Sequence, residues 1–154
     1  MSIIQVSVHG LMVDPYNKAY VVLLKDEEET ELLPIWVGKP EANAIGLAME
    51  EVTPPRPMTH DLLHNVIEVL EARALSVVIH DLHDNTFYAK IHLMRGDGEV
   101  TVDARPSDAI ALALRADCPV FVDSKVLEKN EASELEQWLE HLKPEDFDTS
   151  DGAA

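Results

Sequence analysis

The segment "VDARPSDAIALAL", Val102–Leu114, places two aspartates, an arginine and a proline within six residues, where a strand pattern changes to an alanine-rich helix pattern. Proline is common in the first turn of a helix, because the N–H that it lacks would have no partner there. The residues after Asp108 are apolar almost all round the predicted helix, so we expect that helix to be buried. The segment therefore predicts a charged helix start that leads into the protein core.

A second copy of this arrangement lies earlier in the chain. The runs "AYVVLL", "LLPIWV" and "GKPEANAIGLAM" parallel "TFYAKIHL", "VTVD" and "ARPSDAIALAL", at offsets of 65 to 68 residues. Lys39-Pro40 thus corresponds to Arg105-Pro106. Because strands, basic-proline step and helix repeat in the same order, we predict an internal duplication, which fixes the architecture. The expected fold class is α+β, with duplicated β-hairpin plus helix units forming a mixed or antiparallel sheet with packed helices.

The acidic residues of the second copy are not repeated in the first. Asp103 corresponds to Val37, and Asp108 corresponds to Ala42 or Asn43. A purely structural role gives little reason for aspartates in one copy alone. The asymmetry therefore favours a functional site in the second copy.

Hydrophobic periodicity and turn signals predict the other elements. The expected strands cover residues 3–13, 19–25, 32–37, 75–82, 86–94 and 99–103. Helices are expected from Pro40, over 61–72, after Arg105 and, as an amphipathic helix, over 131–142. The proline-rich run "EVTPPRPMTH" is expected to be a stiff connector. We expect one domain over 1–128, and an acidic C-terminal helix with a frayed tail over 129–154.

The charge of the chain limits what it binds. Twelve Lys and Arg stand against 29 Asp and Glu, a net charge of −17, and residues 1–122 alone have 9 basic and 19 acidic side chains. Nucleic-acid binding rests on several contacts between basic side chains and phosphates. Nucleic acid is therefore expected as a substrate of a small local site and not as a tightly bound partner. The chain shows neither a charged leader nor a run of about 20 apolar residues, so we expect a cytoplasmic protein without membrane contact.

Asp103, Arg105 and Asp108 form the first candidate site. Asp103 and Arg105 are expected on the same face of the ending strand, with Asp108 in the first helical turn beside them. Two carboxylates suit a hard cation such as Mg²⁺, and an arginine binds phosphate in a bidentate fork. The alternative is structural: Ser107 caps the helix, Asp108 complements the helix dipole, and Arg105 pairs with Asp103.

The run "RPMTHD", Arg56–Asp61, repeats the order of arginine, proline, hydroxyl residue and acid ahead of a helix. Thr59 is a natural N-cap, and His60 is able to exchange a proton near neutral pH. The alternative is a capped helix with an exposed histidine. If the two helix starts face each other, their arginines, histidine and carboxylates are suited to metal-assisted phosphodiester cleavage.

"HDLLH" allows a different interpretation. His60 and His64, four residues apart with an acid between them, are similar to the zinc helix of metalloproteases. Asp61 is one methylene shorter than the glutamate of that motif, and only Glu68 and Glu71 are available downstream as a third ligand. This hypothesis requires a third ligand close to both histidines.

Four segments, "LPIWVGKPEANAI", "RPMTHDLLHNVIEVL", "DNTFYAKI" and "VDARPSDAIALALR", resemble the bifunctional nuclease domain family over about residues 3–128. The resemblance implies an α+β domain, activity on both DNA and RNA, and assembly into oligomers. The matching motif residues in this chain are Glu41, Asn43, Arg56, Pro57, Thr59, His60, Asp61, Asp103, Arg105, Pro106, Ser107 and Asp108.

The leading hypothesis is a metal-dependent nuclease that acts as a homo-oligomer. In it Asp103 and Asp108 hold Mg²⁺ or Mn²⁺, with Asp61 as a further catalytic candidate. Arg56 and Arg105 bind the phosphate and His60 moves the proton. The side chains expected to contact the substrate are Lys39, Glu41, Asn43, Thr59 and Ser107. The alternative is a non-catalytic oligomeric module that binds a small anionic ligand or acts in regulation.

Overall fold

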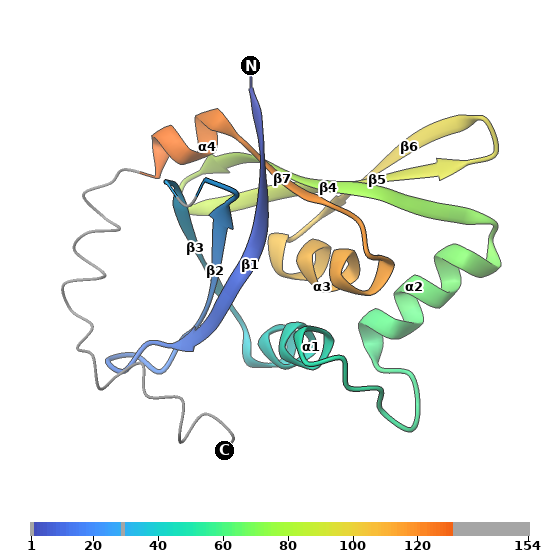
Figure 1. Ribbon diagram of the computed structural model, residues 1–154, viewed down its shortest axis with the longest axis horizontal. Helices are drawn as coiled ribbons and strands as arrows, with labels where there is room; N and C mark the ends of the chain where they lie inside the picture. The colour runs from blue at the N-terminus through green and yellow to red at the C-terminus, as the bar shows by residue number, and fades with distance from the viewer. Residues whose placement is uncertain (1, 29, 131–154) are drawn as a thin grey trace.

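A single seven-stranded sheet organises the chain in the computed structural model, which describes residues 2–28 and 30–130 (Figure 1). The strand order is β3-β2-β1-β7-β4-β5-β6. The strands are β1 (Ile3–Val13), β2 (Tyr20–Asp26), β3 (Leu32–Val37), β4 (Ala72–His83), β5 (Thr86–Arg95), β6 (Gly98–Ala104) and β7 (Val120–Asp123). The helices are α1 (Lys39–Met49), α2 (Thr59–Val69), α3 (Pro106–Ala116) and α4 (Ser124–Lys129).

The predicted duplication is visible in the sheet. β1-β2-β3 and β4-β5-β6 are both antiparallel meanders, and each is followed by a helix, α1 or α3. The two meanders occupy opposite ends of the sheet, and β7 lies between them. β7 is antiparallel to β1 and parallel to β4, so the sheet is mixed. The α+β fold class with duplicated hairpin and helix units is therefore confirmed.

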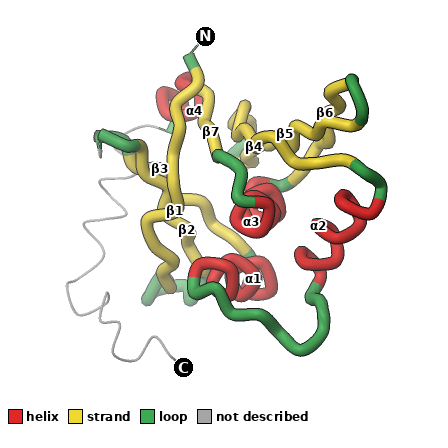
Figure 2. Tube along the Cα trace, turned by 45° about the vertical axis from the view of Figure 1, so that its right-hand side comes forward, coloured by secondary structure: helices red, strands yellow, loops and turns green. Residues whose placement is uncertain are grey.

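Helices α1, α2 and α3 lie on one side of the sheet, with α3 between α1 and α2 (Figure 2). The helix α3 is buried almost all round, as its sequence predicts: five consecutive residues, Ala109 to Ala113, are at most 1% exposed. Burial of so much aliphatic surface is the main stabilising contribution in a core of this kind. The start of α3 is thus fixed by the core and holds its charged residues in place.

The helix α2 packs little of its apolar surface against the rest of the described chain. Only His60 and Ile67 are buried in it. The exposed apolar side chains are Leu62, Leu63, Val66, Val69 and Leu70, with Val69 80% exposed. α2 also begins at Thr59, two residues before its expected start, because Met58 occupies the N-cap and donates its N–H to Asp61 Oδ2 at 2.9 Å. Thr59 is therefore not the cap.

The end of the described chain adds two elements that the periodicity did not predict, β7 and α4. In α4, Val126 is fully buried, and the helix packs on β4 and β7 from the side opposite to α3 (Figure 1). The predicted helix over 131–142 lies outside the described residues. Among the helices that the structure describes, none is long and apolar enough to span a bilayer.

Candidate functional site

The first turns of three helices border one cavity of about 650 Å³. The residues that these helix starts contribute are Pro40, Glu41, Asn43, Met58, Thr59, His60, Arg105 and Asp108. Each helix follows an N-cap with extended backbone, so its first N–H groups have no partner within the helix. The positive ends of three helix dipoles therefore act at this cavity, and such ends favour bound anions.

A chain of ionic contacts joins the three helix starts. Arg105 Nη2 lies 2.9 Å from Glu41 Oε1, and Arg105 Nε donates to Asp108 Oδ2 at 2.9 Å. Asp108 Oδ1 is 2.8 Å from His60 Nε2. His60 is only 8% exposed, so the alternative of a capped helix with an exposed histidine is wrong. The Arg105 side chain is 66% exposed and open to a ligand.

The contacts among His60, Arg105 and Asp108 favour the ionised forms of Asp108 and Arg105. Burial acts to raise the pKa of Asp108, but the hydrogen bonds from His60 and Arg105 outweigh it, and the pKa lies below its ordinary value. The bond with Asp108 raises the pKa of Arg105. In the neutral tautomer that donates Nε2–H to Asp108, the lone pair of His60 is on Nδ1. The arrangement therefore holds an anionic carboxylate behind a histidine base.

The carboxylate of Glu41 lies close against Gly38. A Cβ atom on Gly38 would lie 3.0 Å from Glu41 Oε2, a distance that requires the carboxylate to move. Oε2 itself is buried and has no hydrogen-bond partner among the described residues. Glu41 therefore supports Arg105 through Oε1 while its second oxygen is shielded from solvent.

Asp103 borders the cavity but is directed away from the other acids. The register of β5 and β6 pairs Asp103 with Lys90, and pairs Ala104 with the buried Ala89. Since successive strand residues point to opposite faces, the Asp103 side chain lies on the face opposite to α3. On that face burial lowers the pKa of His80, Lys90 lowers it further, and Asp103 acts in the opposite direction. The expected shared face of Asp103 and Arg105 is not observed, because Arg105 is already the N-cap of α3.

The carboxylates are not arranged as the predicted metal site requires. Both oxygens of Asp108 are bonded, Glu41 Oε2 is buried, and Asp103 points elsewhere. Within the described residues, no three His, Cys, Asp or Glu side chains group closely enough to hold a metal ion. The donor set in this arrangement does not fit an octahedral Mg²⁺ bound by Asp103 and Asp108.

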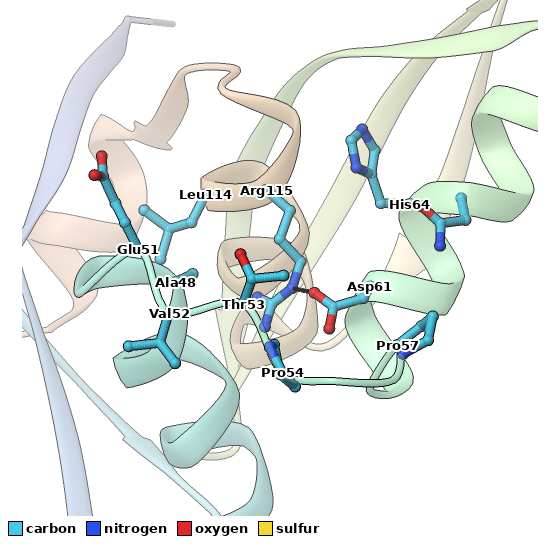
Figure 3. A pocket seen from close by; sticks show the side chains of 11 residues that line it. Ala48, Glu51, Val52, Thr53, Pro54, Pro57, Asp61, His64, Leu114 and Arg115 are labelled. Atoms are coloured by element: carbon cyan, nitrogen blue, oxygen red, sulfur yellow. Dashed lines mark hydrogen bonds and ion pairs between the residues drawn. The ribbon is translucent and has the colours of Figure 1, made fainter.

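Asp61 belongs to a different contact. Its Oδ1 accepts from Arg115 Nε at 2.6 Å (Figure 3). Arg115 also donates to the carbonyl oxygens of Ala111 and Ala44. The Met58 N–H and then Arg115 lower the pKa of Asp61. The Arg115 side chain is 9% exposed, so this buried guanidinium ties the start of α2 to α3 and α1. The two residues border a separate cavity of about 480 Å³.

The remaining predicted residues divide between the cavity and its surroundings. Asn43 and Thr59 line the cavity with the charged cluster. Lys39 and Arg56 are exposed and outside its lining, and Ser107 is buried at 6% exposure in the first turn of α3. The structure thus brings together the helix starts of the two arginine-proline motifs, but through the contact of His60 with Asp108 and not through Arg56.

The zinc-helix hypothesis finds no support in the contacts of its two histidines. His64 Nε2 is 3.2 Å from Glu68 Oε1 on the same helix, whereas His60 contacts Asp108 on α3. Each histidine thus has its own carboxylate partner, and no described third ligand joins them. His60 thus lies at the cavity, whereas His64 pairs with a residue of its own helix.

Sequence reasoning missed Arg115 and the apolar wall of the cavity. The wall consists of Ala44, Met58, Leu63, Ile91, Val102 and Ala104. An arginine in the last turn of an otherwise apolar buried helix was the available signal for Arg115, since buried charges need partners. No local pattern indicates which strand residues come to face α2.

The sequence is similar to known proteins over the stretch that contains the cavity residues. An uncharacterized protein of Mycobacterium tuberculosis is 35% identical over 162 residues, covering 93% of this chain and 97% of the relative. Bifunctional nuclease 1 of Oryza sativa subsp. japonica is 27% identical over 115 residues, covering 72% of this chain but 35% of that protein. The bifunctional nuclease domain matches residues 22–134, which include every charged residue of the cavity. The chain belongs to the bifunctional nuclease domain family.

Proposed function

We propose that the cavity bordered by α1, α2 and α3 hydrolyses phosphodiester bonds of DNA and RNA. The observation that carries the proposal is the chain of contacts from Glu41 through Arg105 and Asp108 to His60, at the edge of a cavity with three helix N-termini. Family membership and the name of the rice relative support the same class of activity. A phosphate at Arg105 would lie close to a proton-accepting histidine.

The proposed reaction uses three side chains in distinct roles. Arg105 binds a non-bridging phosphate oxygen through Nη1 and stabilises the charge that develops on it. His60 takes a proton from water through Nδ1, the water oxygen forms a bond to phosphorus, and the ester P–O bond breaks. The leaving oxygen takes up a proton from solvent water, and Asp108 stays ionised and stabilises the imidazolium until it releases its proton to solvent. Asp61 and Arg115 hold α2 so that His60 meets Asp108.

Mg²⁺ or Mn²⁺ remains a predicted cofactor, and no step above depends on it. The experiment that tests the proposal compares Asp108→Asn with Asp103→Asn on labelled single-stranded DNA and RNA, with Mg²⁺, with Mn²⁺ and with EDTA. We expect Asp108→Asn to slow cleavage strongly and Asp103→Asn to retain it. Loss of cleavage in both variants, together with inhibition by EDTA, supports the predicted metal site instead. Unchanged cleavage by Asp108→Asn contradicts the proposal.

The alternative, a non-catalytic module that binds a small anion, rests on one specific observation. Arg105 is already neutralised by Asp108 and Glu41, as in a structural junction between helices. Such a module binds phosphate esters at Arg105 without breaking them. Binding that is retained with no product over a long incubation identifies this function.

We also propose that the chain forms a homo-oligomer through the exposed apolar side of α2. Four exposed apolar side chains outside the cavity recur at helical spacing on one side of α2: Leu62, Val66, Val69 and the C-cap residue Leu70. Exposed apolar patches of this kind often mark protein–protein interfaces. A second copy supplies the same apolar surface, which suits a self-complementary interface. Sedimentation of the wild type and of Val69→Asp tests this: the variant is expected to sediment as a smaller species.

A further inference from the structure

The cavity at α2 and β6 has one charged edge and one apolar wall. The charged edge contains Glu41, His60, Arg105 and Asp108, and the wall is formed by the aliphatic side chains already named. A ligand that fills both parts needs an anionic group joined to an apolar body. A nucleotide combines these two properties, with a phosphate and a base whose faces are apolar.

The size of the cavity limits how much of a strand it accepts. Its volume of about 650 Å³ is within the range of small-molecule sites, roughly 300–1,000 Å³. Grooves that follow a single strand combine basic side chains with aromatic rings on which successive bases stack. The described lining of this cavity contains no Phe, Tyr or Trp. It therefore has the size of a pocket for a single ligand and lacks the features of a groove.

The charges around the cavity favour one phosphate over many. Arg105 is the sole Lys or Arg among the residues that line it in the described part of the chain. Its Nε and Nη2 contact carboxylates, which leaves Nη1 for a phosphate oxygen. Additional phosphates of a long strand would meet a protein of net charge −17. Each further phosphate outside the cavity adds repulsion by this net negative charge.

We infer that the cavity binds a dinucleotide-sized phosphodiester, either free or as the terminal segment of a strand, and not the interior of a long nucleic acid. The inference rests on the proposed function, because it assigns the substrate class of the same site. Arg105 binds the single phosphate, and the wall at Leu63 and Val102 contacts the base. A nuclease with this cavity removes nucleotides from an end or hydrolyses short oligonucleotides.

The test measures binding apart from cleavage. Phosphorothioate oligonucleotides keep their charge and resist hydrolysis, so we would titrate a dinucleotide, a linear thirty-nucleotide strand and a circular strand of equal length by calorimetry. We expect the dinucleotide and the linear strand to bind within about threefold of each other, and the circle at least tenfold more weakly. For the dinucleotide and for the linear strand, the slope of the logarithm of the binding constant against the logarithm of the salt concentration is expected to be about −1 or shallower. One phosphate contact contributes roughly −0.7 to this slope.

Two variants assign the binding to the cavity. Val102→Asp places a charge in the apolar wall, on β6 and away from the α2 surface proposed for the oligomer, and is expected to weaken dinucleotide binding at least tenfold. Val52→Asp, at a residue 48% exposed outside this cavity, serves as the matched control. Equal binding of circle and linear strand overturns the inference, as does an absence of binding to all three. Cleavage of an unmodified circle also overturns it, but leaves the proposed nuclease activity standing.

Discussion

Two neighbouring residues in the first turn of α2 make two different contacts with α3. His60 meets Asp108 beside the exposed Arg105, at the edge of an open cavity. Asp61 meets the buried Arg115, which is also bonded to two backbone carbonyls. The first pair has the access that chemistry needs, and the second has the burial that fixes a helix position. The same residue types thus serve a site or a scaffold according to their surroundings.

The largest effect is expected for the contact between His60 and Asp108, which we call the open contact because it lies at the edge of the cavity. His60→Gln removes the base but keeps a polar side chain of similar size, so we predict that turnover falls by about 10²–10³. The free energy of unfolding should change by less than about 1 kcal/mol, because the amide can still bond to Asp108. Turnover on an oligonucleotide and urea unfolding are measured on the same preparation. Asp97→Asn, in the exposed β5–β6 turn, is the control.

The contact between Asp61 and the buried Arg115 should show the opposite pattern, a loss of stability with little loss of activity. Arg115→Met leaves Asp61 without its cation and the carbonyls of Ala44 and Ala111 without a donor, so we predict a loss of about 2–3 kcal/mol in unfolding free energy. Activity per folded molecule should remain within about threefold of the wild type. A variant that is as stable as the wild type but inactive would make Arg115 part of the chemistry and remove the distinction between the two contacts.

The acid sensitivity of Asp61 sharpens the comparison further. Its folded pKa lies below the ordinary 3.8, so its contacts stabilise the protein above that pH, and this contribution disappears as the pH falls through the folded value. Asp61→Asn is therefore predicted to cost about 1–2 kcal/mol at pH 7, and progressively less below about pH 4. Urea unfolding of the wild type and the variant between pH 7 and pH 3 measures the difference between their free energies of unfolding. A difference that is constant with pH argues against an ionised Asp61 that stabilises the start of α2.

The smallest effect is expected at the exposed end of the open contact. Arg105→Lys keeps the charge but loses the fork that reaches a phosphate, Asp108 and Glu41 together, so we predict that KM rises by about 3–10-fold. Stability should not change measurably, because the side chain is 66% exposed. An equal rise in KM for Lys39→Ala, in the other repeat, would show that the two basic-proline steps are equivalent.

Much of the fold was predictable because its signals are local. The proline steps, the turns and the alternation of apolar residues determined six strands, and the repeat gave their grouping. β7 was missed because its short run "VFVD" follows Cys118-Pro119 and pairs with two strands distant in sequence. The exposure of α2 could not be predicted, since an apolar face in a sequence does not reveal whether the chain itself covers it.

The candidate site was predictable in its motifs and not in their partners. The two arginine-proline motifs indicate where α2 and α3 begin. Whether these helix starts meet, and which of their side chains enter the cavity, depends on tertiary packing and helix orientation. The direction of Asp103 was open to prediction: Val100 and Val102 alternate with Glu99, Thr101 and Asp103, which places Asp103 on the polar face of β6. Arg105 does not continue this alternation because the helix cap begins there.

The most direct test of the cavity as a nuclease site is a double-mutant cycle of kcat/KM with His60→Gln, Asp108→Asn and the double variant. Residues that act as one unit show losses that do not multiply. The account predicts that the double variant is about as slow as the slower single variant. Multiplying losses, or cleavage by all three variants at the wild-type rate, would contradict it.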